Sequence, residues 1–471
     1  MRRSLPVLLP LLLVSSPAWS AAYYFLDAGT RGLSRGGAFV AGADDISAQW
    51  YNPAGLIHVR GTQATIDMTG VSQYVLFDRA DEGDLVFEAV TNDAPPMAIP
   101  SFGVSTDFGL DKFTFALGLY PPYAPDMSYP EDGPQRYTLV DTLVLQAFAG
   151  PSVAWQPKPW LTVGGGVAWT FMKAEQELTV AMCAAGADCG DNVSQDVNIR
   201  LEALEPARVI WNAGVLVEPT EWLSVGASVV PPITFRAEGT ITADFGEDFG
   251  LASLLAETSY TDDDIVLVVP MPLIARLGVA VRPMPNLEVE LASVYEGWHV
   301  SEVLLVDEVD LAVTFNEDSA LAPDEPIVLT DDIELKTGYQ DTISARLGAD
   351  WDINPRWTAR AGTFLETSGV PKETQGVGLV DGLKFGYGVG GGVQIIRPLT
   401  LDLGVSQSFI QKREITDSEV TMIQLNLDLG DPEASGIIPG KVVGNGTFAS
   451  HLTMVSAGLT WRFGKGDQPE G

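Results

Sequence analysis

The chain has 471 residues, of which 46% are hydrophobic and 19% are charged, and it contains 48 glycines and 31 prolines. Its 62 acidic residues outnumber its 27 basic ones, giving a formal net charge of −35. That balance leaves no basic face for phosphates and excludes nucleic acid as a partner. Abundant glycine and proline with few charges favour many strands and turns over packed helices.

Residues 1–22 have the pattern of a secretory signal peptide. Arg2 and Arg3 precede an apolar stretch at 5–14, and small residues follow at 18–22. The alternative, a signal anchor, is disfavoured because the stretch is short and carries two prolines. The most apolar later run, 265–281, is interrupted by prolines and an arginine, so no transmembrane helix is expected in the mature chain.

The remainder of the chain shows the period-two pattern of a membrane β-barrel. Between 273 and 282, Leu277 and Val279 alternate with Arg276 and Gly278, and similar patterns recur at 342–351 and 399–409. One face is apolar and the other is small or charged, which is typical of a strand between lipid and a wide lumen. The predicted strands cover about 62–76, 97–108, 112–121, 140–156, 160–173, 208–218, 222–236, 271–282, 286–300, 341–353, 356–368, 383–396, 399–412 and 449–463.

The connections between these strands alternate between short and long. Bacterial barrels have short periplasmic turns and longer external loops, so this alternation predicts an antiparallel barrel of fourteen strands and its orientation. Aromatic residues near strand ends indicate an interfacial girdle, at Trp160, Trp222, Trp351, Trp357, Trp461 and Phe463.

The segment at 23–58, before the first strand, carries the motif Asn52-Pro53-Ala54-Gly55, preceded by Trp50-Tyr51 and an Ala-Asp-Asp sequence at 43–45. With the later segments 275–283, 341–351 and 457–463, this chain resembles the outer-membrane long-chain fatty acid transporters called FadL-like, which include TodX-like aromatic hydrocarbon channels. The resemblance implies an all-β, fourteen-stranded transmembrane barrel with an N-terminal hatch in its lumen. The implied domains are a signal peptide at 1–22, a hatch at 23–58, a barrel at 59–463 and a short tail at 464–471, a tail that departs from barrels ending at the final aromatic residue.

The resemblance implies uptake of long-chain fatty acids or similar hydrophobic compounds across the outer membrane of a Gram-negative bacterium. The expected partners are the hydrophobic solute, outer-membrane lipid and the barrel assembly machinery, and the protein is expected to be a monomer. Two alternatives remain open within this fold: an aromatic hydrocarbon channel, and a structural or adhesion barrel that transports nothing. An enzyme is not expected, because His58, His299 and His451 stand in no recognisable nucleophile motif.

The resemblance also assigns candidate roles to residues. Asn52, Pro53, Ala54 and Gly55 would form the gating turn, although an ordinary tight turn is the simpler interpretation. A kink in the third strand would open the wall sideways, with Gly118, Tyr120, Pro121 and Pro122 as candidates, because proline donates no ladder hydrogen bond. The break could equally mark where that strand leaves the membrane.

Ligand contacts are expected from apolar residues and from arginines at the end of an apolar groove. The candidates are Phe39, Trp50, Tyr51, Arg276 and Arg346. The alternative for the inward arginines is an ion-pair network that braces the wall and holds Arg31 and Arg35 of the hatch.

Cys183 and Cys189 lie in one long external loop, and an exported location predicts a disulfide between them. Acidic runs at 262–264 and 331–332 match no calcium-loop spacing and are interpreted as solvated charge. No metal site and no cofactor are expected.

Overall fold

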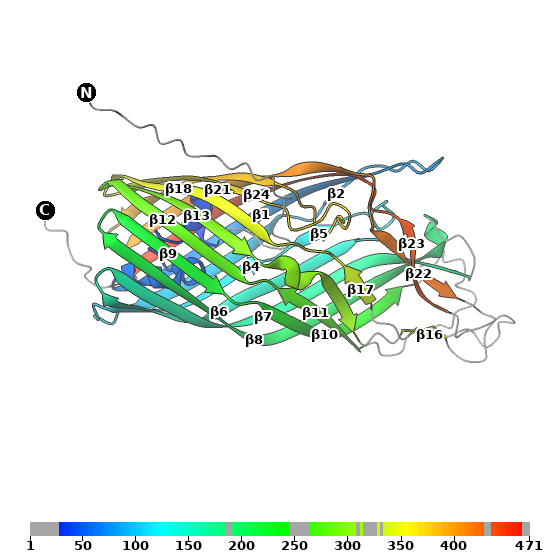
Figure 1. Cartoon of the computed structure of the whole chain (residues 1–471), viewed down its shortest axis with the longest axis horizontal. Coiled ribbons are helices and arrows are strands. Elements are labelled where there is room, and N and C mark those ends of the chain that lie inside the picture. Colours follow the sequence, from blue (N-terminus) through cyan, green and yellow to red (C-terminus); the bar gives the residue numbers. More distant parts are fainter. Residues whose placement is uncertain are drawn as a thin grey trace, which may run out of the picture.

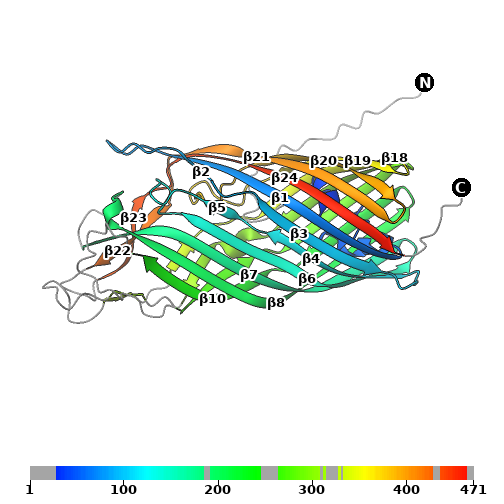
Figure 2. The same cartoon turned by 180° about the vertical axis from the view of Figure 1, so that it is seen from behind.

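The computed structural model describes residues 28–184, 191–244, 264–307, 311–313, 327–329, 333–427 and 435–463. Their main feature is a closed barrel of fourteen antiparallel strands, as the alternation predicts (Figures 1 and 2). The wall strands in order are β1 (Thr62–Arg79), β3 (Met97–Thr106), β4 (Phe113–Tyr123), β6 (Asp141–Lys158), β7 (Leu161–Ala184), β8 (Asp196–Thr220), β9 (Leu223–Val230), β12 (Ile274–Met284), β13 (Leu287–Glu296), β18 (Thr342–Asn354), β19 (Trp357–Glu366), β20 (Lys384–Ile396), β21 (Leu399–Ile415) and β24 (Gly446–Phe463).

The first and last strands close the barrel. The ladder between β1 and β24 runs without a register shift from Thr62↔Phe463 to Arg79↔Gly446. Each wall strand also pairs with its neighbours in chain order, so the barrel leaves no open sheet edge in the membrane.

The two faces of the wall follow the predicted alternation. In β12, Arg276 and Gly278 are buried in the lumen, whereas Leu277 and Val279 are exposed on the outside. The predicted girdle tryptophans are all exposed, as a position against lipid requires, at Trp160, Trp222, Trp351, Trp357 and Trp461. Among the described residues, no helix is long and apolar enough to span a membrane.

Two predicted strands end earlier than the sequence pattern suggests. The predicted strand at 222–236 is divided into β9 and β10 (Ile233–Asp244), because Pro231 and Pro232 cannot donate ladder hydrogen bonds. β10 then pairs with the outer part of β8, whereas β9 pairs with the part of β8 nearer the short connections. The predicted strand at 286–300 ends at Glu296 and is followed by the 3-10 helix η4 (Trp298–Ser301).

Beyond the membrane-facing wall, shorter strands extend the barrel at the end with long connections, on the right of Figure 1. They are β2 (Val90–Thr91), β5 (Asp126–Ser128), β11 (Asp264–Met271), β14 (Val303–Asp307), β17 (Ile333–Lys336), β22 (Thr421–Leu427) and β23 (Gly436–Val442), with the 3-10 helix η2 (Val193–Gln195). β15 (Leu311–Val313) and β16 (Ile327–Leu329) pair with each other in a separate two-stranded sheet. β22 crosses from the β21 side and pairs in parallel with β7, from Gln424↔Ala181 to Leu427↔Ala184.

Residues 28–58, which we call the lumenal segment, lie inside the barrel toward the end with short connections, shown in dark blue in Figures 1 and 2. The segment contains α1 (Thr30–Ser34), α2 (Ala48–Tyr51) and the 3-10 helix η1 (Pro53–His58). α1 contacts β19, β20, β21, β24 and β1, while η1 contacts β4, β6, β7 and β8. The segment therefore fills the lumen between opposite walls. The predicted signal peptide and the C-terminal tail lie outside the described residues.

Candidate functional site

A single buried carboxylate of the wall holds the lumenal segment at one side. Glu290 on β13 accepts hydrogen bonds from the backbone N–H groups of Val40, Ala41 and Gly42, at 2.6, 2.9 and 2.9 Å. The guanidinium of Arg35 donates to the same carboxylate at 3.2 Å. Because Glu290 and Arg35 are both fully buried, these charge-assisted bonds fix the segment in place.

The arginines of the segment join a wider ion-pair network with the wall. Arg35 also pairs with Asp350 at 2.5 Å and Glu288 at 3.2 Å. Arg360 bridges Asp350 at 2.8 Å and Asp402 at 2.5 Å. The network predicted for Arg35 and the inward arginines is therefore present.

Asn52 occupies the centre of the segment's contact with the opposite wall. Its side-chain amide donates to the carbonyl oxygens of Val40 at 2.9 Å and of Val215 on β8 at 3.1 Å. The side-chain amide oxygen of Asn52 accepts a hydrogen bond from the N–H of Ala54 at 3.2 Å, and so caps η1, which begins with Pro53. Asn52 thus closes the predicted turn and also ties that turn to the barrel.

Close approach at this turn depends on glycine. A Cβ added at Gly55 would lie 2.1 Å from the carbonyl oxygen of Ala43, and one at Gly214 would lie 2.1 Å from the amide oxygen of Asn52. A side chain at Gly55 or at Gly214 would therefore collide with the turn at 52–55.

The structure separates the predicted ligand contacts into two groups. Phe39 and Tyr51 pack inside the lumenal segment, with their rings 5.5 Å apart and the guanidinium of Arg35 5.0 Å from the Phe39 ring. Trp50 instead faces the wall, where its ring lies 5.5 Å from Phe148 and 4.8 Å from the guanidinium of Arg276. Of the five candidates, Phe39 and Tyr51 therefore form one contact pair, and Trp50 and Arg276 form another.

Arg346 belongs to a different cluster, farther along the lumen. It donates to Ser344 at 2.9 Å and pairs with Glu366 at 3.3 Å, and Glu366 also pairs with Lys384 at 3.1 Å. Arg413 donates to the carbonyl oxygen of Val370 and to Gln375, both at 2.8 Å, in a connection that folds inward between β19 and β20. The side chains of these contacts are polar and closely paired.

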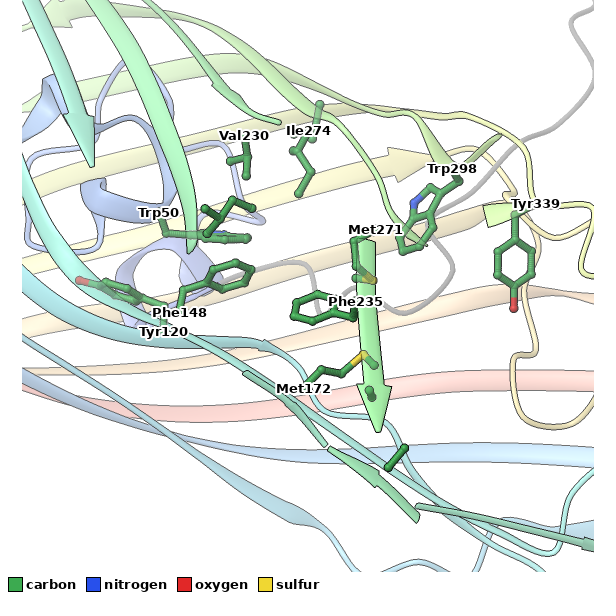
Figure 3. Packing of buried hydrophobic residues seen from close by; sticks show 14 of the residues in the cluster. Trp50, Tyr120, Phe148, Met172, Val230, Phe235, Met271, Ile274, Trp298 and Tyr339 are labelled. Carbon is green, nitrogen blue, oxygen red and sulfur yellow. The ribbon is translucent and has the colours of Figure 1, made fainter. Parts of the chain in front are cut away.

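A buried apolar cluster leads outward from Trp50 (Figure 3). It includes inward side chains of β6 to β12 and ends near η4. Its larger members are Tyr120, Phe148, Met172, Val230, Phe235, Met271, Ile274, Trp298 and Tyr339. The predicted small and charged inward face therefore describes only part of the lumen. Both alternate sets of residues at 265–269 are apolar, a signal that the sequence contained.

The third wall strand parts from the second at the predicted residues. The ladder between β3 and β4 ends at Phe102↔Leu119, although β4 continues to Tyr123. On the other side, the register between β4 and β6 shifts between Tyr120 and Tyr123, across Pro121 and Pro122. Gly118 precedes this irregularity, and the hydroxyl of Tyr120 donates to the carbonyl oxygen of Ile46 at 2.8 Å. The irregular stretch is thus bonded directly to the lumenal segment.

A polar cavity of about 570 Å³ lies between the lumenal segment and the short connections. His58 lines it and contacts Glu218 at 3.4 Å. Removal from water lowers the pKa of His58, but the hydrogen bond and charge of Glu218 outweigh this effect and raise it above its usual value.

The predicted disulfide cannot be placed, since Cys189 lies outside the described residues, as do the acidic residues at 262–263 and 331–332. Within the described part of the chain, no group of three or more potential metal ligands forms a metal site. Glu290 falls on the lumenal phase of its strand and belongs to the ion-pair network that the sequence predicts. Sequence reasoning missed Gln49 and Asn212, because their bonding partners are distant in sequence and no local pattern indicates them.

A closed barrel with an apolar outer face, an internal segment and a buried apolar cluster beside it is typical of outer-membrane transport barrels. Comparison with family models agrees with this class. The chain belongs to the family described as Outer membrane protein transport protein (OMPP1/FadL/TodX), whose model matches residues 11–442. It is therefore an outer-membrane transport protein for hydrophobic compounds, in a family of channels and not of enzymes.

Solved structures share the fold at low sequence identity. A Pseudomonas aeruginosa FadL homologue matches with a TM-score of 0.72 and 15% identity, over 94% of this chain and 100% of that one. The Pseudomonas putida toluene transporter TodX matches with a TM-score of 0.63 and 14% identity, over 95% and 100% of the two chains. The Ralstonia pickettii toluene transporter TbuX gives 0.59 and 14%, over 93% and 99%. A comparison with curated proteins found no significant match.

Proposed function

We propose that this protein takes up long-chain fatty acids and that the lumenal segment is the hatch that gates their passage. The observation that carries the proposal is the apolar cluster that leads along the lumen to Trp50, where a guanidinium, that of Arg276, lies 4.8 Å from the indole. An alkyl chain gains about 0.8 kcal/mol for each buried methylene, so such a track binds long chains without reactive groups. Arg276 supplies a positive partner for a carboxylate at its inner end.

The position of the inner end of the apolar cluster indicates where the ligand leaves the barrel. The lumenal segment fills the barrel beyond Trp50, and the ladder between β3 and β4 ends beside the same region. We infer that the ligand leaves sideways through the wall near Pro121 and Pro122 into the outer membrane. Met172 and Met271 lie along the track, and their flexible side chains suit a path that must yield to ligands of varied shape.

The experiment measures initial uptake of labelled palmitate and toluene by Gram-negative cells that lack their own fatty acid transporter. Arg276→Gln should lower palmitate uptake about tenfold, the effect of losing one charge-assisted hydrogen bond, and leave toluene unchanged. Arg356→Gln is the matched control, since Arg356 lines the polar cavity at the opposite end of the lumenal segment. Uptake of toluene but not palmitate by the wild type would replace this proposal with a hydrocarbon channel. Uptake of neither would favour a barrel that transports nothing.

A further inference from the structure

A small cavity of about 40 Å³ lies where the lumenal segment meets the irregular part of the wall. Its apolar lining includes Trp50, Tyr120, Phe148 and Ile210, and its wall side includes Gly118. A cavity needs about 10–15 Å³ to hold one water molecule. The cavity therefore has room for a polar head group, and an alkyl chain would have to lie outside it.

Two amide side chains also line this cavity, and the backbone fixes their orientation. The Nε2 group of Gln49 donates to the carbonyl oxygen of Gly150 at 3.2 Å and to the hydroxyl of Ser152 at 2.9 Å. The Nδ2 group of Asn212 donates to the backbone carbonyl of Gln49 at 2.6 Å. Because a backbone carbonyl only accepts hydrogen bonds, each amide must turn its nitrogen toward that carbonyl and its oxygen elsewhere.

The two amide oxygens lie over glycines of the wall. A Cβ added at Gly118 would be 2.4 Å from Oε1 of Gln49, and one added at Gly166 would be 2.8 Å from Oδ1 of Asn212. Both oxygens are buried, and neither accepts a hydrogen bond from the described part of the chain. Gln49 itself is only 6% exposed. Buried acceptors without a donor are costly, so a ligand that supplies donors would be favoured here.

The absence of charged side chains among the residues that line this cavity limits the chemical class of the ligand. Arg276 lies over the Trp50 ring but does not line this cavity, and its lining contains no charged side chain. Two carbonyl dipoles repel a carboxylate, and an apolar surround disfavours any unpaired charge. A hydrocarbon or an ester offers no donor. An uncharged group with an O–H fits both the acceptors and the apolar lining.

We propose that this cavity is a head-group site for an uncharged hydrogen-bond donor, a protonated carboxylic acid or an alcohol, on the ligand's way out of the lumen. The inference rests on the proposed function, because it assumes that an amphipathic ligand passes Trp50 toward the gap beside β4. It adds that the acid leaves in its neutral form. The neutral form is also the one that enters lipid at low cost.

The test compares uptake of hexadecanoic acid, hexadecanol and methyl hexadecanoate by the cells described above. In the wild type, the acid and the alcohol should both enter faster than the ester. Gln49→Met and Asn212→Leu keep side-chain size but remove the whole amide, and with it the acceptor oxygen that the ligand would use. Each should reduce the acid-to-ester and alcohol-to-ester ratios about fivefold, the effect of one ordinary hydrogen bond. Gln146→Met is the control, since Gln146 is a buried lumenal amide on β6 outside the cavity lining.

The outcomes separate this inference from the proposed function. If the wild type transports all three ligands at equal rates, the head-group site is wrong and fatty acid uptake stands. If the ratios are unchanged in both variants, or fall equally in Gln146→Met, the assignment to Gln49 and Asn212 is wrong. If the wild type transports none of the three, both proposals fail. The comparison within the wild type decides the matter even if a variant does not fold.

Discussion

At the scale of single residues, buried polar groups attach the lumenal segment to the wall. Glu290 and Asn52 each form hydrogen bonds with several backbone groups. Removing one partner from such a group leaves the others buried and unpaired, which costs far more than an exposed contact. The segment also bonds to the wall elsewhere, for example from Thr30 to Asp67 and from Ser228 to the carbonyl oxygen of Tyr51. A single substitution at Glu290 or Asn52 should therefore loosen the segment locally without unfolding the wall.

Asn52→Ala tests this expectation. The change removes two donors and one acceptor, and it should weaken attachment of the segment by on the order of 2 kcal/mol. Channel conductance in planar bilayers should rise, while the barrel remains heat-modifiable on gels. The matched control is Asn192→Ala, because Asn192 caps η2 through the same kind of bond, to Ser194 at 3.2 Å, but in an exposed loop. Equal conductance in both variants would show that Asn52 is an ordinary turn residue.

His58 gives the attachment a dependence on pH. Contact with Glu218 raises the pKa of His58 in the folded state. The stabilisation that this contact gives to the attached lumenal segment is therefore complete below the unfolded pKa of about 6.5. It is lost as the pH rises through the folded pKa. The urea concentration at which conductance appears should therefore be higher at pH 6 than at pH 8.5.

His58→Gln should abolish this difference. His299→Gln should retain it, since His299 pairs with Asp341 at 2.6 Å in η4, at the outer end of the apolar cluster. If His58→Gln showed the same difference between pH 6 and pH 8.5 as the wild type, the pH dependence would belong to another titratable group.

At the scale of elements, the end of the ladder between β3 and β4 is the feature on which lateral exit depends. Replacing Pro121 and Pro122 together by alanine supplies two N–H groups with which β4 can continue its ladder. The gap should narrow and palmitate uptake should fall several-fold, with the barrel still folded. Pro151→Ala is the control, because Pro151 lies in regular register opposite Leu117. Undiminished uptake in the double variant would mean that these prolines only mark the end of the membrane-facing strand.

The elements differ in how far the sequence predicts them. Wall strands such as β12 and β18 could be predicted, because a face toward lipid and a face toward the lumen impose a period of two. The parallel pairing of β22 with β7 could not, since it joins residues more than two hundred positions apart through backbone bonds that any side chain allows. The same holds for the cavity amides: the contact of Asn212 with Gln49 depends on how the segment sits inside the closed barrel.

At the scale of the whole molecule, the lumen holds both apolar and paired charged side chains. The apolar cluster from Trp50 to Trp298 also includes Phe364, whose ring lies 5.5 Å from the guanidinium of Arg346, and Arg346 pairs with Glu366. A long amphipathic ligand can lie along the apolar cluster while these charges stay paired with one another.

The ladder between β1 and β24 has a consequence for the order of events during biogenesis. Its partners, such as Thr62 and Phe463, stand at opposite ends of the barrel sequence, so closure must wait until the last strand has been synthesised and delivered. Contacts of such long sequence separation form slowly. The lumenal segment precedes β1 and touches strands from β1 to β24. The lumenal segment therefore lacks its wall partners until the barrel closes around it. Although it precedes all the wall strands in the chain, it is among the last parts to reach its final position.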